Sequence, residues 1–155
     1  MGTVYLESTE VSDIRTLGEI QELLSRKGAR SINVAYENGR VISVDFAFTV
    51  GEQIIPFRLP CRFAAVEKIL RHCNKKLKRN DTYADWARRV AWRQILYWLK
   101  AQLALIETDM VRTEEVFLPY AIVATSEGQK SVYEFMIEKH FLALPAPKDT
   151  TPENP

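Results

Sequence analysis

Hydrophobic and polar positions follow a helical period near the start of the chain. Apolar residues recur every three or four positions over residues 17–27, which predicts a helix there. Thr16 as N-cap and Glu19 three positions later form a capping box at the start of this helix. Gly28 offers the left-handed conformation that commonly follows the end of a helix.

The pattern then changes to the alternation of a half-buried β-strand on both sides of Asn38-Gly39. Both residues tolerate the positive φ of a type I′ turn, so we predict a hairpin whose second strand ends at Val50. Residues 53–59 form a third predicted strand, placed at an edge because Pro56 has no backbone N–H to donate. The three strands predict an antiparallel sheet with one face on the core and the other in solvent.

Helical periodicity returns after the sheet. Pro60 suits the start of a second helix, and the longest predicted helix covers residues 82–108. This long helix is apolar nearly all round its axis and carries all three tryptophans of the protein. Such a pattern is typical of a central, buried helix, and we interpret Trp92 and Trp98 as core residues.

A last helix is predicted over residues 132–140, where Ser131 and Glu134 form a second capping box. Taken together, the elements predict an α+β fold. A small antiparallel sheet, a meander with the Asn-Gly hairpin, packs on a long central helix and two or three shorter helices.

Length and composition fit a single core, with 155 residues of which 46% are hydrophobic. We predict one α+β domain over residues 1–144 and a disordered tail over residues 145–155, where four prolines leave little to bury. No apolar run approaches the roughly 20 residues that cross a bilayer. The first residues also lack the basic and apolar regions of a signal peptide. We therefore expect a cytoplasmic protein with no membrane partner.

Charge is distributed unevenly along the chain, although the formal net charge is only +1. Twelve basic and three acidic residues lie between Arg58 and Lys100, so this stretch carries +9 and the rest of the chain −8. Such segregation indicates a basic surface that attracts an anionic partner, nucleic acid above all.

Seven residues are the candidates for nucleic-acid binding. Arg89, Arg93 and Lys100 fall within a narrow sector of the long helix, and a basic run over residues 75–79 precedes it. Cations in such a row can contact successive phosphates. They can equally form ion pairs with acidic residues from other parts of the chain, and the sequence leaves both interpretations open. The candidate residues are Lys75, Lys76, Lys78, Arg79, Arg89, Arg93 and Lys100.

Residues that could carry catalysis are few. The only histidines, His72 and His140, lie in no recognisable catalytic motif, and no phosphate-binding or dinucleotide-binding glycine pattern is present. Cys61 and Cys73 are interpreted as reduced thiols, because a His72-Cys73 metal site would lack a further pair of ligands. We therefore expect a protein that is not an enzyme and uses no cofactor or metal.

The long helix and the residues after it resemble a group of small uncharacterised proteins encoded by tailed bacteriophages and prophages. The likeness covers roughly residues 16–145 and implies a protein that works in the cytoplasm of an infected or lysogenic bacterium. It implies no activity. The residues that carry it are Ala91-Trp92-Arg93, Trp98, Ala101-Gln102, Ala104-Leu105-Ile106-Glu107 and Glu115-Val116-Phe117-Leu118-Pro119-Tyr120, with Lys27-Gly28-Ala29 and Phe57-Arg58-Leu59-Pro60 upstream.

Three functional hypotheses follow. The first is an accessory protein of a phage replication or recombination module that binds nucleic acid, DNA rather than RNA, although the isoelectric point of about 7.8 is low for this class. The second is an inhibitor of a bacterial defence system, similar to an anti-CRISPR, that binds a host defence protein. The third is a small virion or oligomeric structural component.

Overall fold

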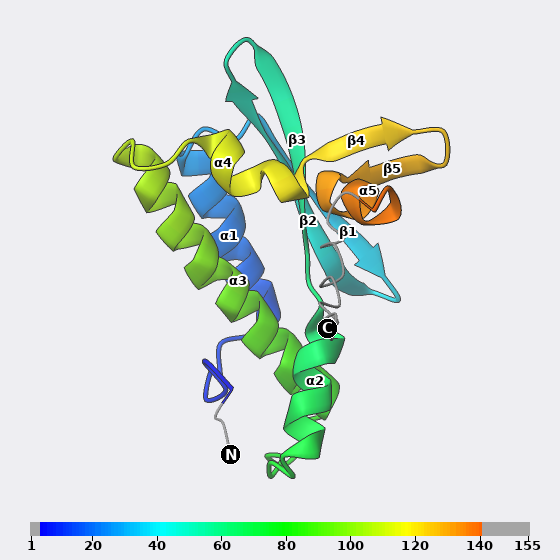
Figure 1. The fold of residues 1–155 in the computed structure, drawn as a ribbon. Coiled ribbons are helices and arrows are strands. Elements are labelled where there is room, and N and C mark those ends of the chain that lie inside the picture. The colour runs from blue at the N-terminus through cyan, green and yellow to red at the C-terminus, as the bar shows by residue number, and fades with distance from the viewer. Residues whose placement is uncertain (1–3, 141–155) are drawn as a thin grey trace, which may run out of the picture.

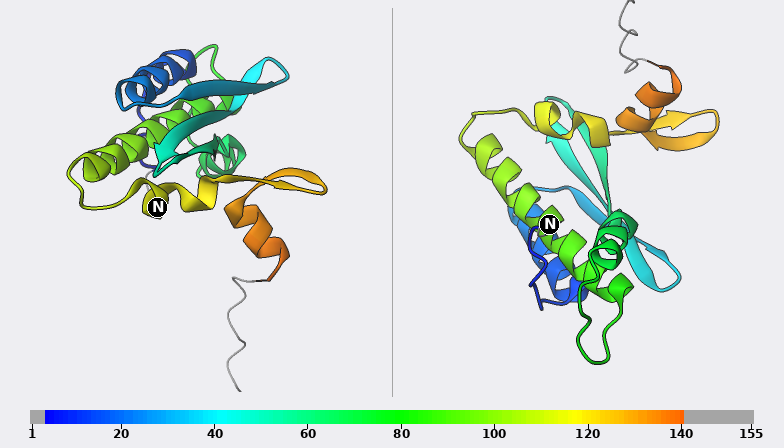
Figure 2. Two further views of the ribbon diagram at one scale, coloured as in Figure 1. Left: turned by 90° about the horizontal axis from the view of Figure 1, so that it is seen from above. Right: turned by 60° about the horizontal axis from the view of Figure 1, so that its bottom comes forward.

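The computed structural model describes residues 4–140 and has an α+β fold in which helices pack against a small antiparallel sheet (Figure 1). Helix α1 (Asp13–Arg26) lies on one side of the central helix α3 (Tyr83–Glu107). The unit formed by β4 (Ile122–Thr125), β5 (Gly128–Ser131) and α5 (Val132–Glu138) lies on the opposite side (Figure 2). Within the described residues, no helix combines the length and the apolar character needed to cross a membrane.

Helix α1 spans Asp13–Arg26 and begins earlier than its pattern suggested. Its N-cap is Ser12, whose hydroxyl accepts a hydrogen bond from the backbone N–H of Arg15 at 3.2 Å. The predicted N-cap, Thr16, lies inside the helix and is fully buried, so the predicted start was wrong. Both residues are good caps, and the packing of α1 against α3 decided between them. The predicted end is confirmed, because Gly28 has φ of 90°.

The sheet contains β1 (Ser31–Glu37), β2 (Arg40–Val50) and β3 (Gln53–Pro60) in the order β1-β2-β3. The predicted hairpin is confirmed, since Asn38 and Gly39 have φ of 50° and 74°. The predicted edge position of β3 is confirmed as well. One face of β2 packs into the core. The other face is less exposed than expected, because Ser43 and Ala47 are small residues shielded by the strands on either side.

Helix α3 (Tyr83–Glu107) agrees with the predicted range, with Thr82 as its N-cap. Its buried side chains occupy one broad face rather than the whole circumference. Trp92 is fully buried, as expected, but Trp98 is only partly buried and Tyr97 is exposed. Helix α2 (Phe63–His72) packs against α3. Its predicted start at Pro60 was wrong, because that residue still pairs with Ser43 in the sheet.

A cluster of aromatic rings holds the sheet to the segment that follows α3. Phe117 ends the short helix α4 (Thr113–Phe117) and is fully buried. The centroid of its ring lies 5.4 Å from that of Phe46 and 5.5 Å from that of Phe57. These contacts place the 3₁₀ turn η1 (Leu118–Tyr120) beside the edge strand β3.

The last described elements are β4 (Ile122–Thr125), β5 (Gly128–Ser131) and α5 (Val132–Glu138). The predicted capping box is confirmed: Ser131 accepts a hydrogen bond from the N–H of Glu134, and the Glu134 carboxylate accepts one in return. Strand β5 was not expected, since its sequence lacks apolar alternation. The predicted tail over residues 145–155 lies outside the described residues.

Candidate functional site

The seven predicted nucleic-acid-binding residues lie in the loop between α2 and α3 and along α3. The N-terminal segment, residues 4–12, crosses the same part of α3. Trp86 donates from Nε1 to the carbonyl of Glu7 at 2.7 Å, and Gln94 donates from Nε2 to the carbonyl of Tyr5 at 2.7 Å. These two hydrogen bonds bring an acidic stretch of chain against the basic one.

Two loop cations form ion pairs with this N-terminal segment. Lys75 Nζ lies 3.0 Å from a carboxylate oxygen of Glu7, and Lys78 pairs with Glu10. The hydrogen bond from Lys75 lowers the pKa of Glu7, and that from Lys78 lowers the pKa of Glu10. Both acids are therefore ionised at neutral pH, and each offsets the charge of one lysine.

The two arginines of the predicted helix stripe are also paired. Arg89 donates to Asp81 from Nη1 at 3.1 Å and from Nη2 at 2.7 Å, and the Arg93 guanidinium lies 2.8 Å from Glu19 of α1. The two-fold hydrogen bond with Arg89 lowers the pKa of Asp81 and raises that of Arg89. The four side chains are part-buried, so the pairs join elements of the fold.

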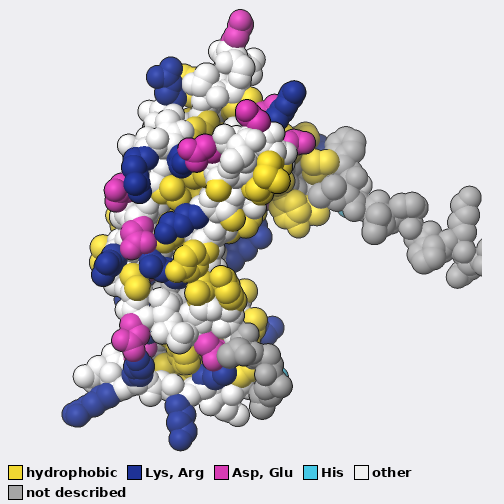
Figure 3. All heavy atoms as spheres, turned by 90° about the vertical axis from the view of Figure 1, so that its left-hand side faces the viewer, with side chains coloured by type: hydrophobic (Ala, Val, Ile, Leu, Met, Phe, Trp, Pro, Cys, Tyr) yellow, Lys and Arg dark blue, Asp and Glu magenta, His cyan; other side chains and the backbone are white. Residues whose placement is uncertain are grey.

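Three of the seven candidates have no carboxylate partner among residues 4–140. Lys76 and Arg79 are exposed in the loop. The third is Lys100, whose Nζ lies 5.7 Å from the centroid of the Tyr97 ring. Figure 3 shows basic and acidic side chains interspersed along one face, with basic side chains projecting at the end where the α2–α3 loop lies. The charge segregation of the sequence is thus largely cancelled in space.

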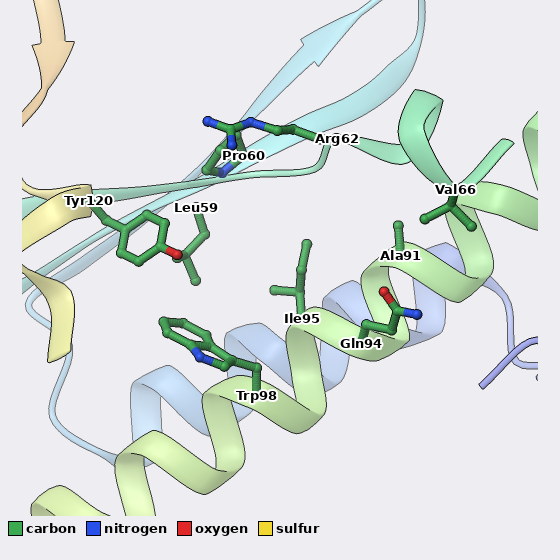
Figure 4. Close-up of a pocket in the computed structure, with 9 residues that line it drawn as sticks. All are labelled: Leu59, Pro60, Arg62, Val66, Ala91, Gln94, Ile95, Trp98 and Tyr120. Carbon is green, nitrogen blue, oxygen red and sulfur yellow. The ribbon is translucent and has the colours of Figure 1, made fainter. Parts of the chain in front are cut away.

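An apolar hollow forms a second candidate site between β3, α2, α3 and η1, with a volume of about 320 Å³. We call it the Trp98 groove. The indole of Trp98 packs edge-on against the rings of Phe117 and Tyr120, at 5.8 and 5.6 Å between centroids, and leaves part of its surface open (Figure 4). Its lining residues are Leu59, Pro60, Arg62, Val66, Ala91, Gln94, Ile95, Trp98 and Tyr120.

Two further hollows adjoin the Trp98 groove. One, with a volume of about 160 Å³, shares Pro60, Arg62 and Tyr120 with the groove and is otherwise lined by Arg58, Pro119 and the start of α5. The other shares Gln94 and Trp98 and includes Tyr5 and Tyr97. Both hollows thus share lining side chains with the Trp98 groove.

Sequence reasoning missed this groove. The groove is lined by residues near positions 60, 95 and 120. In each of these stretches the periodicity of apolar residues is the one expected of a buried core segment. The one local signal was the full-circle apolar pattern of α3. Such a pattern indicates either a helix buried on all sides or a helix with an uncovered apolar face.

Groups with catalytic chemistry are dispersed in the described residues. His72 and His140 are both exposed and lie on different elements. Burial raises the pKa of the Cys61 thiol to about 12, which keeps it protonated and unreactive at neutral pH. No group of three or more His, Cys, Asp or Glu side chains within residues 4–140 is arranged to hold a metal ion.

Comparison with known proteins found no family model, no curated protein and no solved structure that matches this chain. The two surfaces described above, the α2–α3 loop and the Trp98 groove, are therefore what bears on its function.

Proposed function

We propose that this protein acts by binding another protein through the Trp98 groove. The observation that carries the proposal is the combination of a part-exposed tryptophan, the ring of Tyr120 and the guanidinium of Arg62 around one apolar hollow. Tryptophan, tyrosine and arginine are the residues that most often dominate the energy of protein interfaces, and they do so in hollows that exclude water.

Arg62 adds specificity to the groove. Its side chain is exposed at the N-cap of α2 and makes no ion pair within the described part of the chain. An acidic or carbonyl-rich segment of a partner can supply the missing acceptor while its apolar side chains cover Trp98. If the resemblance to phage proteins holds, the partner is a protein of the infected bacterium. Inhibition of a defence system is then one form of this function.

Nucleic-acid binding is a second candidate, supported by the exposed cations of the α2–α3 loop. Lys76 and Arg79 are free to contact phosphates, and Lys100 lies further along α3. The ion pairs of Lys75, Lys78, Arg89 and Arg93 leave this candidate with fewer free charges than the sequence suggested. We favour the protein-binding function for that reason.

The experiment that separates the two candidates compares capture by four tagged proteins from lysates of infected and uninfected bacteria. They are wild type, Arg62→Glu in the groove, Lys68→Glu as a matched charge change elsewhere on α2, and the double variant Lys76→Glu/Arg79→Glu. A partner retained by wild type and Lys68→Glu but lost by Arg62→Glu supports the groove. Capture that is insensitive to Arg62→Glu and lost only in the double variant contradicts it.

A further inference from the structure

The N-terminal segment, residues 4–12, lies against the first half of α3 and the α2–α3 loop, and we call it the N-terminal strap (Figure 2). It is held by two hydrogen bonds from α3 side chains and by the ion pairs of Glu7 and Glu10. None of residues 4–12 is buried. Ion pairs near a surface contribute little free energy and are screened by salt, so the strap is attached more weakly than a segment packed in the core.

The backbone of the strap is strained at one position. Leu6 has φ of 63°, in the left-handed region that a residue with a Cβ atom adopts only at a cost in free energy. The surrounding turn is held by hydrogen bonds from the N–H of Glu7 to the carbonyl of Val4 and from the N–H of Thr9 to the carbonyl of Leu6. Detachment of the strap from α3 lets Leu6 return to an ordinary conformation, which favours release.

The strap lies against an aromatic and basic surface. The rings of Tyr83 and Trp86 are nearly parallel, with 18° between their planes and 6.4 Å between their centroids, and we call them the Tyr83–Trp86 stack. The Tyr83 hydroxyl donates to the carbonyl of Lys75 at 2.5 Å, and the Arg71 guanidinium lies 4.8 Å from the centroid of the Tyr83 ring. These contacts join the stack to the basic α2–α3 loop. Proteins bind single-stranded nucleic acid with such a surface, because bases stack on the rings and phosphates contact the cations.

The acidic side chains of the strap take the place of phosphates at this surface. The carboxylates of Glu7 and Glu10 accept hydrogen bonds from Lys75 and Lys78. The backbone carbonyl of Glu7 accepts the hydrogen bond of the Trp86 indole at 2.7 Å. Lysine binds a carboxylate or a phosphate as a compact point charge, so the strap and a nucleic-acid strand compete for the same two cations.

We propose that the Tyr83–Trp86 stack, Lys75 and Lys78 form a binding site for single-stranded nucleic acid, and that the N-terminal strap is an internal competitor which the strand displaces. The inference rests on the second candidate function and names its ligand and its regulation. A single strand is favoured over a duplex because only unpaired bases can be splayed onto the rings. The affinity for the strand is lowered in proportion to the fraction of molecules in which the strap is closed.

A variant of a strap contact tests the competition without changing any charge. Gln94→Leu removes the side-chain amide that donates to the carbonyl of Tyr5, and Gln102→Leu is the matched change further along α3. Binding of labelled oligodeoxythymidine to the full-length proteins is measured by fluorescence anisotropy. Gln94→Leu should bind roughly 2- to 10-fold more tightly than wild type, which is the effect of losing one hydrogen bond of the closed state. Gln102→Leu should bind as wild type does, and equal affinities of all three proteins would overturn the competition.

Two substitutions of Trp86 separate the strap from the base-stacking platform. Trp86→Phe keeps an aromatic ring but loses the indole N–H that holds the strap, whereas Trp86→Leu loses both. Relative to Trp86→Phe, Trp86→Leu should bind the oligonucleotide roughly 5- to 100-fold more weakly, the range for the loss of one stacked base. Circular dichroism and urea unfolding check that both variants fold. Equal affinities of the two folded variants would overturn base stacking at this site.

Displacement of the strap is measured by ¹⁹F NMR of the full-length protein labelled with 5-fluorotryptophan, with signals assigned by replacing each tryptophan in turn with phenylalanine. Oligodeoxythymidine should shift the Trp86 signal and leave that of the fully buried Trp92 unchanged. A strand that binds but does not move the Trp86 signal would overturn the inference, while the second candidate function would stand. Absence of binding by wild type at low salt would remove that candidate function and the inference with it, so the two failures are distinguishable.

Discussion

The guanidinium of Arg89 donates two hydrogen bonds to the carboxylate of Asp81, at 3.1 and 2.7 Å, and the two side chains are only 21% and 14% exposed. Asp81 is one of only three acidic residues in the basic middle of the chain, and it lies just before the N-cap of α3. Arg89, which we predicted from the sequence to contact phosphate, thus stabilises the start of the central helix instead.

Replacing Arg89 with alanine is therefore expected to destabilise the fold. Removing one partner of a part-buried, charged hydrogen-bonded pair costs about 1.5–3 kcal/mol, and urea unfolding measures the loss. Lys76→Ala, at an exposed position in the nearby loop, is the matched control and should change stability by less than about 0.5 kcal/mol. Equal stabilities of the two variants would show that the Arg89–Asp81 pair contributes nothing.

The same pair predicts a dependence of stability on pH. Because Arg89 lowers the pKa of Asp81 in the folded protein, the contribution of the pair is fully present above the ordinary Asp value of 3.8 and is lost as pH falls through the lowered value. The difference in unfolding free energy between wild type and Asp81→Asn should therefore be large at about pH 6 and shrink at about pH 3. A difference that stays constant over this range would contradict the assignment.

Phe117 is expected to be one of the costliest side chains to remove. It is fully buried against Phe46 and Phe57, and truncating a buried phenylalanine to alanine typically costs about 3–5 kcal/mol. The neighbouring Leu118 is 54% exposed, so Leu118→Ala should cost much less in the same urea titration. A small effect of Phe117→Ala would mean that α4 does not hold η1 to the sheet as the ring contacts indicate.

If the second candidate function holds, DNA binding should depend weakly on salt. With Lys76, Arg79 and Lys100 as the only phosphate contacts, the logarithm of the binding constant should fall against the logarithm of salt concentration with a slope of about −2.7 for duplex DNA and about −2.1 for single-stranded DNA. Fluorescence anisotropy with labelled single- and double-stranded DNA measures this slope. Lys76→Glu/Arg79→Glu should abolish binding. A folded wild-type protein that binds no DNA at low salt would rule the candidate out.

The N-terminal acids provide a test of charge cancellation. Glu7 and Glu10 pair with Lys75 and Lys78, so Glu7→Gln/Glu10→Gln frees two cations of the same loop. In this double variant, DNA binding by the loop should become tighter. The slope of the logarithm of the duplex-DNA binding constant against the logarithm of salt concentration should be steeper by up to about 1.8. Glu22→Gln, which alters an exposed pair within α1, should leave it unchanged. Equal slopes for wild type and the double variant would show that these ion pairs do not keep Lys75 and Lys78 from phosphates.

Several features of the fold could be predicted because their signals are local. The Asn38-Gly39 hairpin follows from two adjacent residues that tolerate positive φ, and the Ser131 capping box from a spacing of three. The start of α1 was mistaken where Ser12 and Thr16 competed as caps, because the choice depended on which position is buried against α3. Strand β5 was missed because its pairing with β4, rather than apolar alternation, makes it a strand.

By itself, the sequence determined the α+β class, the order of most elements and the identity of the basic residues. Only the tertiary structure decided what those residues contact: Lys75 pairs with Glu7, 68 positions away, and Arg93 with Glu19, 74 positions away. It likewise decided that Trp98, Tyr120 and Arg62 surround one open groove. The physical reason is range. Turn and cap preferences act over a few residues, whereas ion pairs and hollows form between segments that become neighbours only when the core assembles.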